Sequence, residues 1–359
     1  MYEQFIRSHN NSQRDSKYHQ QRGWSRIKKV VFASLITTTI LTAVIATLAF
    51  TGVITIFSEP AGAKFPKDFS AALKEFYGAT NGYSWLRKDY WLDEQKSICE
   101  WYGISCKDEK LYLNKDNMDL ETVTLIHLTL DNNNLTGTLP AALHKIKLLR
   151  SLNLRNNSLI GSIPEEFEKL NMLNELMLSD NFLYGSLPIL KNYASIAAID
   201  LSRNRFSGNI PNGFFSEKLA EAKISHNEIE GTISGSLQFL TVLDLSSNRL
   251  TGQLPFFSLD LVYLNLADNM LEGETEPATF SEKLEYLNLA NNKFIAKFSI
   301  LMSLHNIVYL NISNNELTSW RDYYPRFPGK LQRCDASNNL FQCPFVVTWV
   351  EGLCNATCT

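Results

Sequence analysis

The sequence has little of the chemistry that enzymes use. Only six of its 359 residues are histidine, and it contains no Gly-rich phosphate loop, kinase signature, G-x-S-x-G or H-E-x-x-H motif. The histidines are His9, His19, His127, His144, His226 and His305. The first two lie in a basic leader, and the others are spread along the chain without a partner set. We therefore expect no catalytic residue, no cofactor, no metal ion and no enzyme activity.

Cysteine is also scarce, and it is absent from the middle of the chain. Cys99 and Cys106 lie before the repeats described below, and Cys334, Cys343, Cys354 and Cys358 lie in the last repeat and the tail. Cysteines confined to the two ends are typical of disulfides that close a fold in an oxidising compartment. The four C-terminal cysteines permit three pairings, which stay open. No histidine accompanies them, which argues against zinc.

An excess of positive charge is missing outside the first residues. Residues 1–29 carry seven Lys or Arg against Glu3 and Asp15, a net charge of +5. Removing this from the overall charge of −3 leaves −8 for the rest of the chain. A mildly acidic chain argues against nucleic acid as a partner.

One long segment lacks charge altogether. Val30–Phe57 has 28 residues without a charged side chain, which as a helix would reach ~42 Å and exceed the ~30 Å hydrocarbon core of a bilayer. With the basic residues 1–29 on the cytosolic side, the pattern predicts a type II single-pass signal-anchor over 30–57 and an extracellular or lumenal remainder. The alternative is cleavage at Ala61-Gly62-Ala63, which would release a secreted protein.

A repeat fills the region from residue 123 to 342. Ten copies of L-x-x-L-x-L-x-x-N-x-L-x-G-x-I/L-P follow one another with periods of 21 to 24 residues. They start at Leu125, Leu149, Leu173, Ile196, Leu219, Leu240, Leu261, Leu284, Ile307 and Leu331. The apolar places cannot be buried within one copy, so the pattern predicts a solenoid of stacked turns.

The ninth place of the repeat is asparagine in every copy. These residues are Asn133, Asn157, Asn181, Asn204, Asn227, Asn248, Asn269, Asn292, Asn315 and Asn339. A buried amide must satisfy its donors and acceptors, and here the backbone of its own and the adjacent turn can do so. We expect this column to be structural.

These motifs resemble the leucine-rich repeat family, and the G-x-I/L-P ending resembles its plant-type extracellular subclass. The resemblance implies an α/β solenoid, a curved right-handed horseshoe with a parallel sheet on its concave face and a second short sheet beside it. In the last three copies Ala296, Ser319 and Cys343 replace the glycine. We therefore expect the second sheet to fade towards the C-terminal end.

The region before the repeats has the features of an N-terminal cap. Phe69, Leu73 and Phe76 have helical spacing, which predicts an amphipathic helix over 66–77. The run Cys99-Glu100-Trp101-Tyr102-Gly103-Ile104-Ser105-Cys106 resembles the paired-cysteine cap of the plant-type subclass, which implies a disulfide between its cysteines. The polar stretch 107–121 predicts a hairpin or loop. The predicted organisation is tail 1–29, anchor 30–57, juxtamembrane segment and cap 58–122, repeats 123–342 and C-terminal cysteine cap 343–359.

The third, fifth, seventh and eighth places of each copy are predicted to point outward from the concave sheet. In copies seven to nine they present Tyr263, Tyr286 and Tyr309 beside Asn265, Asn288 and Asn311, followed by Arg333. We name the first six residues the Tyr–Asn ladder. Aromatic faces and amides suit a sugar ring or an extended peptide. The other interpretation is packing, because tyrosines in one column of a sheet pack well on each other.

Glycosylation motifs agree with an exported chain. N-x-S/T occurs at Asn134, Asn156, Asn311 and Asn355. Asn311 is also part of the Tyr–Asn ladder, where a glycan would obstruct binding.

Three functions fit the sequence. The first is a membrane-anchored, non-enzymatic recognition or adhesion protein that binds an extracellular protein, peptide or glycan on the concave face and signals through a co-receptor. The second is an inhibitor of a secreted hydrolase, similar to polygalacturonase-inhibiting proteins. The third is a structural coat protein without a specific ligand. The fold alone does not choose among them.

Overall fold

The computed structural model describes residues 65–112, 120–235, 237–274, 280–298, 304–320, 329–341 and 354. They belong to one compact unit, Lys64–Thr359. The predicted tail 1–29, anchor 30–57 and cleavage site 61–63 lie outside the described residues. Within the described ranges, no helix is long and apolar enough to span a bilayer.

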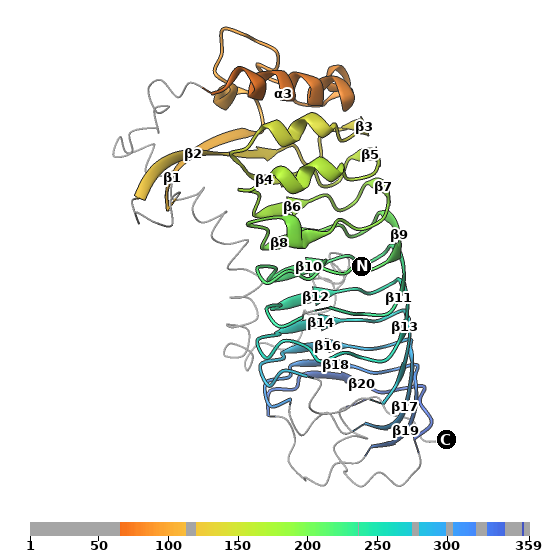
Figure 1. The fold of residues 1–359 in the computed structure, drawn as a ribbon. Helices are drawn as coiled ribbons and strands as arrows, with labels where there is room; N and C mark the ends of the chain where they lie inside the picture. Colours follow the sequence, from red (N-terminus) through yellow and green to blue (C-terminus); the bar gives the residue numbers. More distant parts are fainter. Residues whose placement is uncertain are drawn as a thin grey trace, which may run out of the picture. The chain divides into compact units, whose positions relative to one another are not determined.

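An 11-stranded sheet runs through the unit, and each of the ten copies contributes one strand to it (Figure 1). Strands from successive copies pair in parallel, and β1 is added antiparallel at one end. The predicted parallel-sheet solenoid is confirmed. The strands are β1 (Ile104–Tyr112), β2 (Leu120–Thr129), β4 (Leu149–Asn153), β6 (Glu175–Met177), β8 (Ala198–Asp200), β10 (Glu221–Lys223), β12 (Val242–Asp244), β14 (Tyr263–Asn265), β16 (Tyr286–Asn288), β18 (Tyr309–Asn311) and β20 (Arg333–Asp335).

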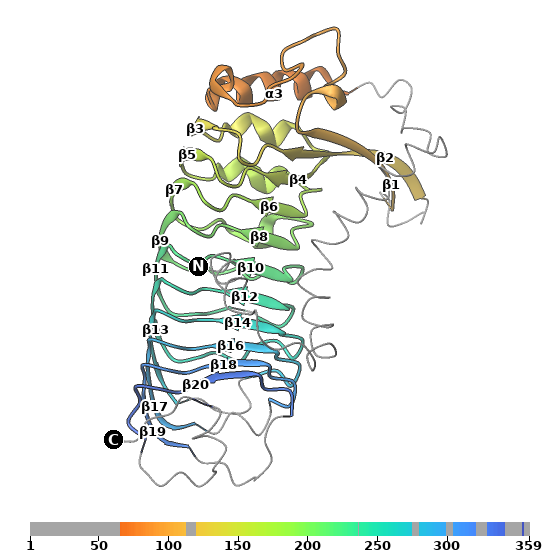
Figure 2. The same ribbon diagram turned by 180° about the vertical axis from the view of Figure 1, so that it is seen from behind.

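A second, nine-stranded sheet takes one strand from each of the first nine copies, in the same order along the stack (Figure 2). Its strands are β3 (Thr136–Thr138), β5 (Ser158–Gly161), β7 (Phe182–Gly185), β9 (Arg205–Asn209), β11 (Glu228–Gly231), β13 (Arg249–Gly252), β15 (Met270–Gly273), β17 (Lys293–Phe298) and β19 (Glu316–Trp320). In the first three turns a short 3₁₀ helix follows this sheet: η3 (Ala141–Lys145), η4 (Glu165–Lys169) and η5 (Leu190–Asn192).

The expectation that the second sheet fades towards the C-terminal end is wrong. Its last two strands, β17 and β19, pair over four positions, with one register shift between them. The repeat glycines have φ between 76° and 91°, and most of the strands that contain one end at it. Where Ala296 and Ser319 replace glycine, the strands continue to Phe298 and Trp320. A side chain at this place disfavours the left-handed conformation that ends the strand.

The predicted N-terminal cap is present at one end of the stack. Helix α3 (Lys67–Ala79) buries Phe69, Leu73 and Phe76, as its amphipathic pattern predicts. It is followed by two 3₁₀ turns, η1 (Gly82–Ser84) and η2 (Ile98–Glu100). The ring centroids of Trp85 and Trp91 are 4.8 Å apart, and those of Trp91 and Trp101 5.1 Å apart. The aromatic cluster thus covers the apolar end that a solenoid would otherwise expose.

Covalent and strand pairing complete the cap. The disulfide Cys99–Cys106, which the family resemblance implies, is present. The described part of the polar stretch after it, residues 107–112 and 120–121, lies in two paired strands, because β1 pairs with β2 in antiparallel register from Ile104–Leu128 to Tyr112–Leu120. This strand pair therefore starts the sheet on which all later turns are stacked.

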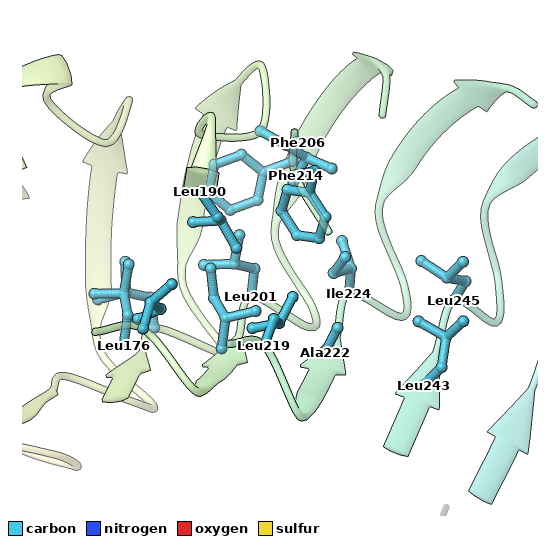
Figure 3. Packing of buried hydrophobic residues seen from close by; sticks show 14 of the residues in the cluster. Leu176, Leu190, Leu201, Phe206, Phe214, Leu219, Ala222, Ile224, Leu243 and Leu245 are labelled. Carbon is cyan, nitrogen blue, oxygen red and sulfur yellow. The ribbon is translucent and has the colours of Figure 1, made fainter. Parts of the chain in front are cut away.

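The core consists of columns of equivalent side chains. Every residue at the first and eleventh places of the repeat is at most 5% exposed. Figure 3 shows the packing in the middle turns, where Leu201 and Ile224 at the sixth place lie next to Phe214, and Leu245 occupies the same place in the following turn. The predicted role of the apolar places in stacking is confirmed.

The asparagine column hydrogen-bonds the backbone of neighbouring turns, as predicted. The Asn157 Oδ1 accepts from the N–H groups of Asn133 and Leu135 in the preceding turn at 3.0 and 2.9 Å. At the cap, where no preceding turn exists, Asn133 bonds the backbone of Arg87 instead. Its Oδ1 accepts from the Arg87 N–H at 2.7 Å and its Nδ2 donates to the Arg87 carbonyl at 2.8 Å. The column therefore also joins the cap to the stack.

Candidate functional site

The outer face of the 11-stranded sheet has two different halves. In its N-terminal half, polar side chains pair with one another, both across neighbouring strands and within one strand. The Ser151 Oγ donates to the Glu175 Oε2 at 2.9 Å, and the Arg155 guanidinium donates to the Asp200 carboxylate at 2.9 Å. The Lys223 Nζ lies 3.7 Å from the Glu221 Oε2. These groups are already satisfied within the fold.

The C-terminal half carries the Tyr–Asn ladder on β14, β16 and β18. Strand register places Tyr263, Tyr286 and Tyr309 side by side, and Asn265, Asn288 and Asn311 likewise. The predicted juxtaposition of these six residues is therefore present, and all six are half-buried. Their role in binding stays a prediction.

The three tyrosine rings stack face to face. The ring centroids of Tyr263 and Tyr286 are 4.3 Å apart with an interplanar angle of 11°, and those of Tyr286 and Tyr309 are 4.4 Å apart with an angle of 4°. Both faces of the Tyr286 ring are thus covered by its neighbours. A sugar ring needs a free aromatic face, so the expected stacking of sugar on each tyrosine is not available at Tyr286. What the stack presents outward is ring edges and phenol groups.

The ladder amides also have a structural role. The Oδ1 atoms of Asn265, Asn288 and Asn311 accept from the backbone N–H two residues later, at 3.3, 3.2 and 3.0 Å. This side-chain to backbone bond forms a turn at the end of each strand. The amide nitrogen of Asn265 also donates to the Ser246 Oγ at 3.1 Å. The fifth place of the repeat is therefore partly scaffold.

Burial raises the pKa of two of the ladder phenols. Burial, followed by the nearby Asp244 carboxylate, raises the pKa of Tyr263 well above its ordinary value. Burial, followed by the neighbouring Tyr309 phenol, likewise raises the pKa of Tyr286, while hydrogen bonds from Tyr263 and Asn288 oppose the rise. Both phenols can act as hydrogen-bond donors over the whole physiological pH range.

An open depression adjoins the last tyrosine. It has a volume of about 390 Å³ and is lined by residues of β18 and β20 and the residue before β20, among them Tyr309, Asn311, Arg333 and Asp335. Arg333 lies directly beside Tyr309 in the strand register. Arg333, predicted as a ladder neighbour, is thus brought to the site. A larger depression, of about 510 Å³, lies away from the sheet, around η4 and η5.

In six turns the seventh place of the repeat does not point outward as predicted, whereas Arg155 at the same place in the second turn does. The seventh-place residues of the six turns are only 4% to 8% exposed: Ser179, Ser225, Ser246, Ala267, Ala290 and Ser313. In turns six to nine the backbone N–H of this residue donates to the fifth-place side chain of the same turn. Over the ladder turns, the outer face therefore consists of the third, fifth and eighth places.

Sequence reasoning gave no role to Asp244 on β12. This residue lies in register with Asn265, one strand before the ladder. The available signal was a carboxylate next to a row of amides at the same repeat position. Burial, as the largest cause, raises the pKa of Asp244, while hydrogen bonds from Ser246 and Asn265 oppose the rise.

The remaining predicted residues are scattered. Cys334 forms a disulfide with Cys354 in the last turn. Cys354 is thus its partner among the three that the sequence left open. Cys343, Cys358 and Asn355 lie outside the described residues. Asn134 and Asn156 are exposed, but their amide nitrogens donate to the Ser84 carbonyl at 3.0 Å and to the Asn132 Oδ1. Their glycosylation stays a prediction.

Comparison with known families identifies the repeat. A family model described as Leucine Rich Repeat matches residues 124–146, 148–170, 195–216 and 239–258. Receptor-like protein 41 of Arabidopsis thaliana is 35% identical over 92 residues, which is 24% of this chain and 10% of that protein. Receptor-like protein 35 of the same plant is 29% identical over 165 residues, 44% of this chain and 15% of that protein. The chain thus spans a small part of these relatives.

Solved structures share the fold. The ectodomain of the Arabidopsis thaliana receptor kinase GASSHO1/SCHENGEN3, in complex with CASPARIAN STRIP INTEGRITY FACTOR 2, has a TM-score of 0.65 at 24% identity, covering 77% of this chain and 33% of that one. The ectodomain of the Arabidopsis receptor kinase HAESA, in complex with an IDA peptide hormone ligand, has a TM-score of 0.53 at 30% identity, covering 59% and 37%. A plant ice-binding protein has a TM-score of 0.56 at 22% identity, covering 79% and 97%.

Proposed function

Because the chain is a leucine-rich repeat protein of the plant extracellular type, we propose that it is a non-enzymatic binding protein which holds an extended peptide along strands β14 to β20. The observation that carries this proposal is the change in the outer face of the 11-stranded sheet. Its N-terminal half satisfies its own charges, whereas its C-terminal half presents a row of phenols and amides that ends at an open depression.

The geometry of the ladder favours a peptide over a glycan. Stacking covers both ring faces of Tyr286, so a sugar would find edges rather than faces there. The tyrosine rings repeat every 4.3 to 4.4 Å along the row. A peptide that crosses the strands offers backbone carbonyls and N–H groups to such a row along its whole length. The peptide hormone bound by the HAESA ectodomain supports this choice of ligand class.

The length of the ladder sets the length of the peptide it can hold. From β14 to β20 there are four strands, so the row spans ~14 Å at the sheet spacing. An extended chain rises ~3.3 Å per residue, so about four residues lie over the row. Residues beyond these four would reach the depression at Arg333 or the strands before β14.

A display experiment tests the proposal. Residues 64–359 contain the whole described core and would be immobilised against a random library of linear peptides. The selected peptides would then be titrated against a triple variant, Tyr263→Phe, Tyr286→Phe and Tyr309→Phe, which keeps the stacked rings and removes the hydroxyls. Loss of three hydrogen bonds at about 0.5–1.5 kcal/mol each predicts affinity lower by roughly tenfold to a thousandfold.

The matched control is Tyr184→Phe. Tyr184 lies on β7 of the other sheet and is 55% exposed, so its hydroxyl should not affect peptide binding. Equal affinity of the triple variant and the wild type would refute the proposed role of the ladder and leave it as a packing column. The absence of any selected peptide would count against the peptide as ligand.

We further propose that residues 30–57 anchor the protein in a membrane and that signalling requires a co-receptor. Support comes from the uncharged run of 28 residues and the basic residues before it. Epitope tags at both ends of the full chain, followed by protease treatment of intact cells, test the orientation. Protection of the N-terminal tag and digestion of the C-terminal tag are expected. Digestion of both tags, or release of the chain into the medium, would contradict the anchor.

A further inference from the structure

Asp244 stands at the N-terminal border of the Tyr–Asn ladder. It is the last residue of β12, with Lys223 on β10 and Asn265 on β14 as its register neighbours. Its Oδ1 accepts from the Ser246 N–H at 3.0 Å and from the Ser246 Oγ at 2.7 Å. One carboxylate oxygen is therefore committed to the turn that follows the strand.

The turn itself does not need a negative charge. Asn311 makes the same two contacts three strands further on, since its Oδ1 accepts from the Ser313 N–H at 3.0 Å and from the Ser313 Oγ at 2.8 Å. Asn265 and Asn288 hold the backbone of their turns in the same way. A neutral amide therefore meets the structural requirement, and the charge of Asp244 is left without a structural explanation.

The charge also lacks a partner within the fold. Asp200, two strands before, is paired with Arg155, and Lys223 lies next to Glu221. In the described part of the chain, no Lys or Arg lies within ion-pair distance of Asp244. His226 is close, but burial, followed by the charge of Arg203, lowers its pKa and keeps the imidazole neutral at pH 7.

The neighbours of Asp244 are neutral hydrogen-bonding groups. The Asn265 amide and the Ser246 hydroxyl donate towards the carboxylate, and the Tyr263 phenol lies close enough to feel its charge. They stabilise the ionised form only in part, because burial still raises the pKa of Asp244. Holding this charge in a half-buried position costs folding free energy.

We propose that Asp244, together with the phenol oxygen of Tyr263, is a subsite for a cationic group of the ligand, namely the guanidinium of an arginine or the ammonium of a lysine side chain. This inference rests on the proposed function, because the cation would belong to the peptide that lies along the ladder. A guanidinium has five donors in a fixed plane, enough for the carboxylate oxygen that the turn does not use and the phenol oxygen together. The bound cation would neutralise the charge that the fold leaves uncompensated.

The test separates the charge of Asp244 from the turn that it forms. Asp244→Asn reproduces at β12 the side chain found at β14, β16 and β18, so the sheet should be unchanged. The matched control is Asp200→Asn on β8, outside the ladder, because the Asp200 Oδ1 likewise accepts from the backbone N–H of Ser202 at 3.1 Å, while its charge is already paired with Arg155. Both variants lose one negative charge from the same register row.

The probe is N-acetylarginine amide, with N-acetylcitrulline amide as its uncharged analogue of the same shape. Saturation-transfer NMR and titration would compare both probes on the wild type and the two variants. We expect the arginine probe to bind the wild type and Asp200→Asn at least tenfold more tightly than the citrulline probe. In Asp244→Asn this preference should disappear, while the denaturation midpoint at pH 7 should rise.

The result that overturns the inference is an arginine preference that is absent from the wild type, persists in Asp244→Asn, or falls equally in both variants. An equal fall would assign the preference to the overall negative potential of the face. Failure of the proposed function is seen separately, as display peptides that bind without the ladder hydroxyls. The two readouts are independent because the small probe does not require the rest of the ladder.

Discussion

Replacing Asn181 by alanine should destabilise the protein strongly, although the side chain touches no ligand surface. Asn181 belongs to the asparagine column and is 5% exposed. Its Oδ1 accepts from the Leu159 N–H of the preceding turn at 3.0 Å. Its Nδ2 donates to the carbonyls of Leu154 at 3.0 Å and of Leu178 at 3.1 Å. One side chain thus bonds two consecutive turns.

The magnitude follows from the groups that the substitution leaves behind. The Leu159 N–H would lose its partner in a site that water does not reach, whereas the Leu154 carbonyl would keep its hydrogen bond from the Asn157 Nδ2 at 3.0 Å. A buried donor without a partner costs about 1–3 kcal/mol, so the expected loss of stability is roughly 1–3 kcal/mol. At about 2–4 °C per kcal/mol for a domain of this order of size, the midpoint should fall by roughly 2–12 °C.

Thermal and urea denaturation of residues 64–359, followed by circular dichroism, measure this loss. Asn171→Ala is the matched control, because Asn171 is an exposed asparagine in the turn just before the copy that contains Asn181. An exposed substitution of this kind changes stability by about 0.5 kcal/mol at most. Equal midpoints for the two variants would refute the idea that the asparagine column holds neighbouring turns together.

Three further outcomes are expected. Gly137→Ala should destabilise the protein more than Gly208→Ala. The new Cβ would lie 2.2 Å from the last carbonyl oxygen of α3 in the first variant and would meet nothing within 4 Å in the second. Chemical denaturation measures both, and equal losses of stability would contradict the close approach. Ser247→Asn should stabilise by roughly 0.5 kcal/mol, since this residue has φ 55° and asparagine tolerates that conformation better than serine; an unchanged or lower midpoint would contradict this. Stability should fall as pH rises above about 10, the ordinary phenol pKa, because Tyr263 and Tyr286 hold their protons more tightly in the folded state than in the unfolded state. If the double variant Tyr263→Phe, Tyr286→Phe shows the same slope of stability against pH, this reasoning fails.

The columns of the solenoid were predictable because each depends on one physical requirement met at a fixed spacing. Leucine at the first place must be buried, and asparagine at the ninth place must satisfy its amide, so the residue type itself reports the environment. The cap helix and the Cys99–Cys106 disulfide were predictable for the same reason: an amphipathic pattern and a motif with few alternative readings.

The eighth place of the repeat was not recognised, although it has the same backbone conformation in all ten turns. Its φ lies between 52° and 58° throughout. The residues there include asparagine, aspartate and histidine, which favour the left-handed region, but also Arg203 and Ser247, which do not. Backbone hydrogen bonds impose the conformation, as when the Arg203 N–H donates to the Ser225 carbonyl at 2.8 Å. Tertiary structure thus overrides local preference, and the residue type no longer reports the environment.

The orientation of the ladder rings was likewise hidden in the sequence. A column of tyrosines is compatible both with rings that lie flat on the sheet and with rings that stack on each other. The strand register brings equivalent residues close enough for the second arrangement, with centroids 4.3 and 4.4 Å apart. Only this geometry decides whether faces or edges meet a ligand, and it turns the same six residues from a sugar platform into a row of hydrogen-bonding groups.

The fifth place of the repeat separates what the fold requires from what a ligand can read. Its Asn and Asp side chains hold the next turn through one oxygen, and the amide of Asn311 does this as well as the carboxylate of Asp244. Met177 and Lys223 occupy the same place on strands that keep the sheet register, so even this hydrogen bond is dispensable. Charge can therefore change along this row at little cost to the scaffold. A binding specificity that depends on fifth-place charges could therefore change one turn at a time. For this reason, a ligand explains the uncompensated charge of Asp244 better than the fold does.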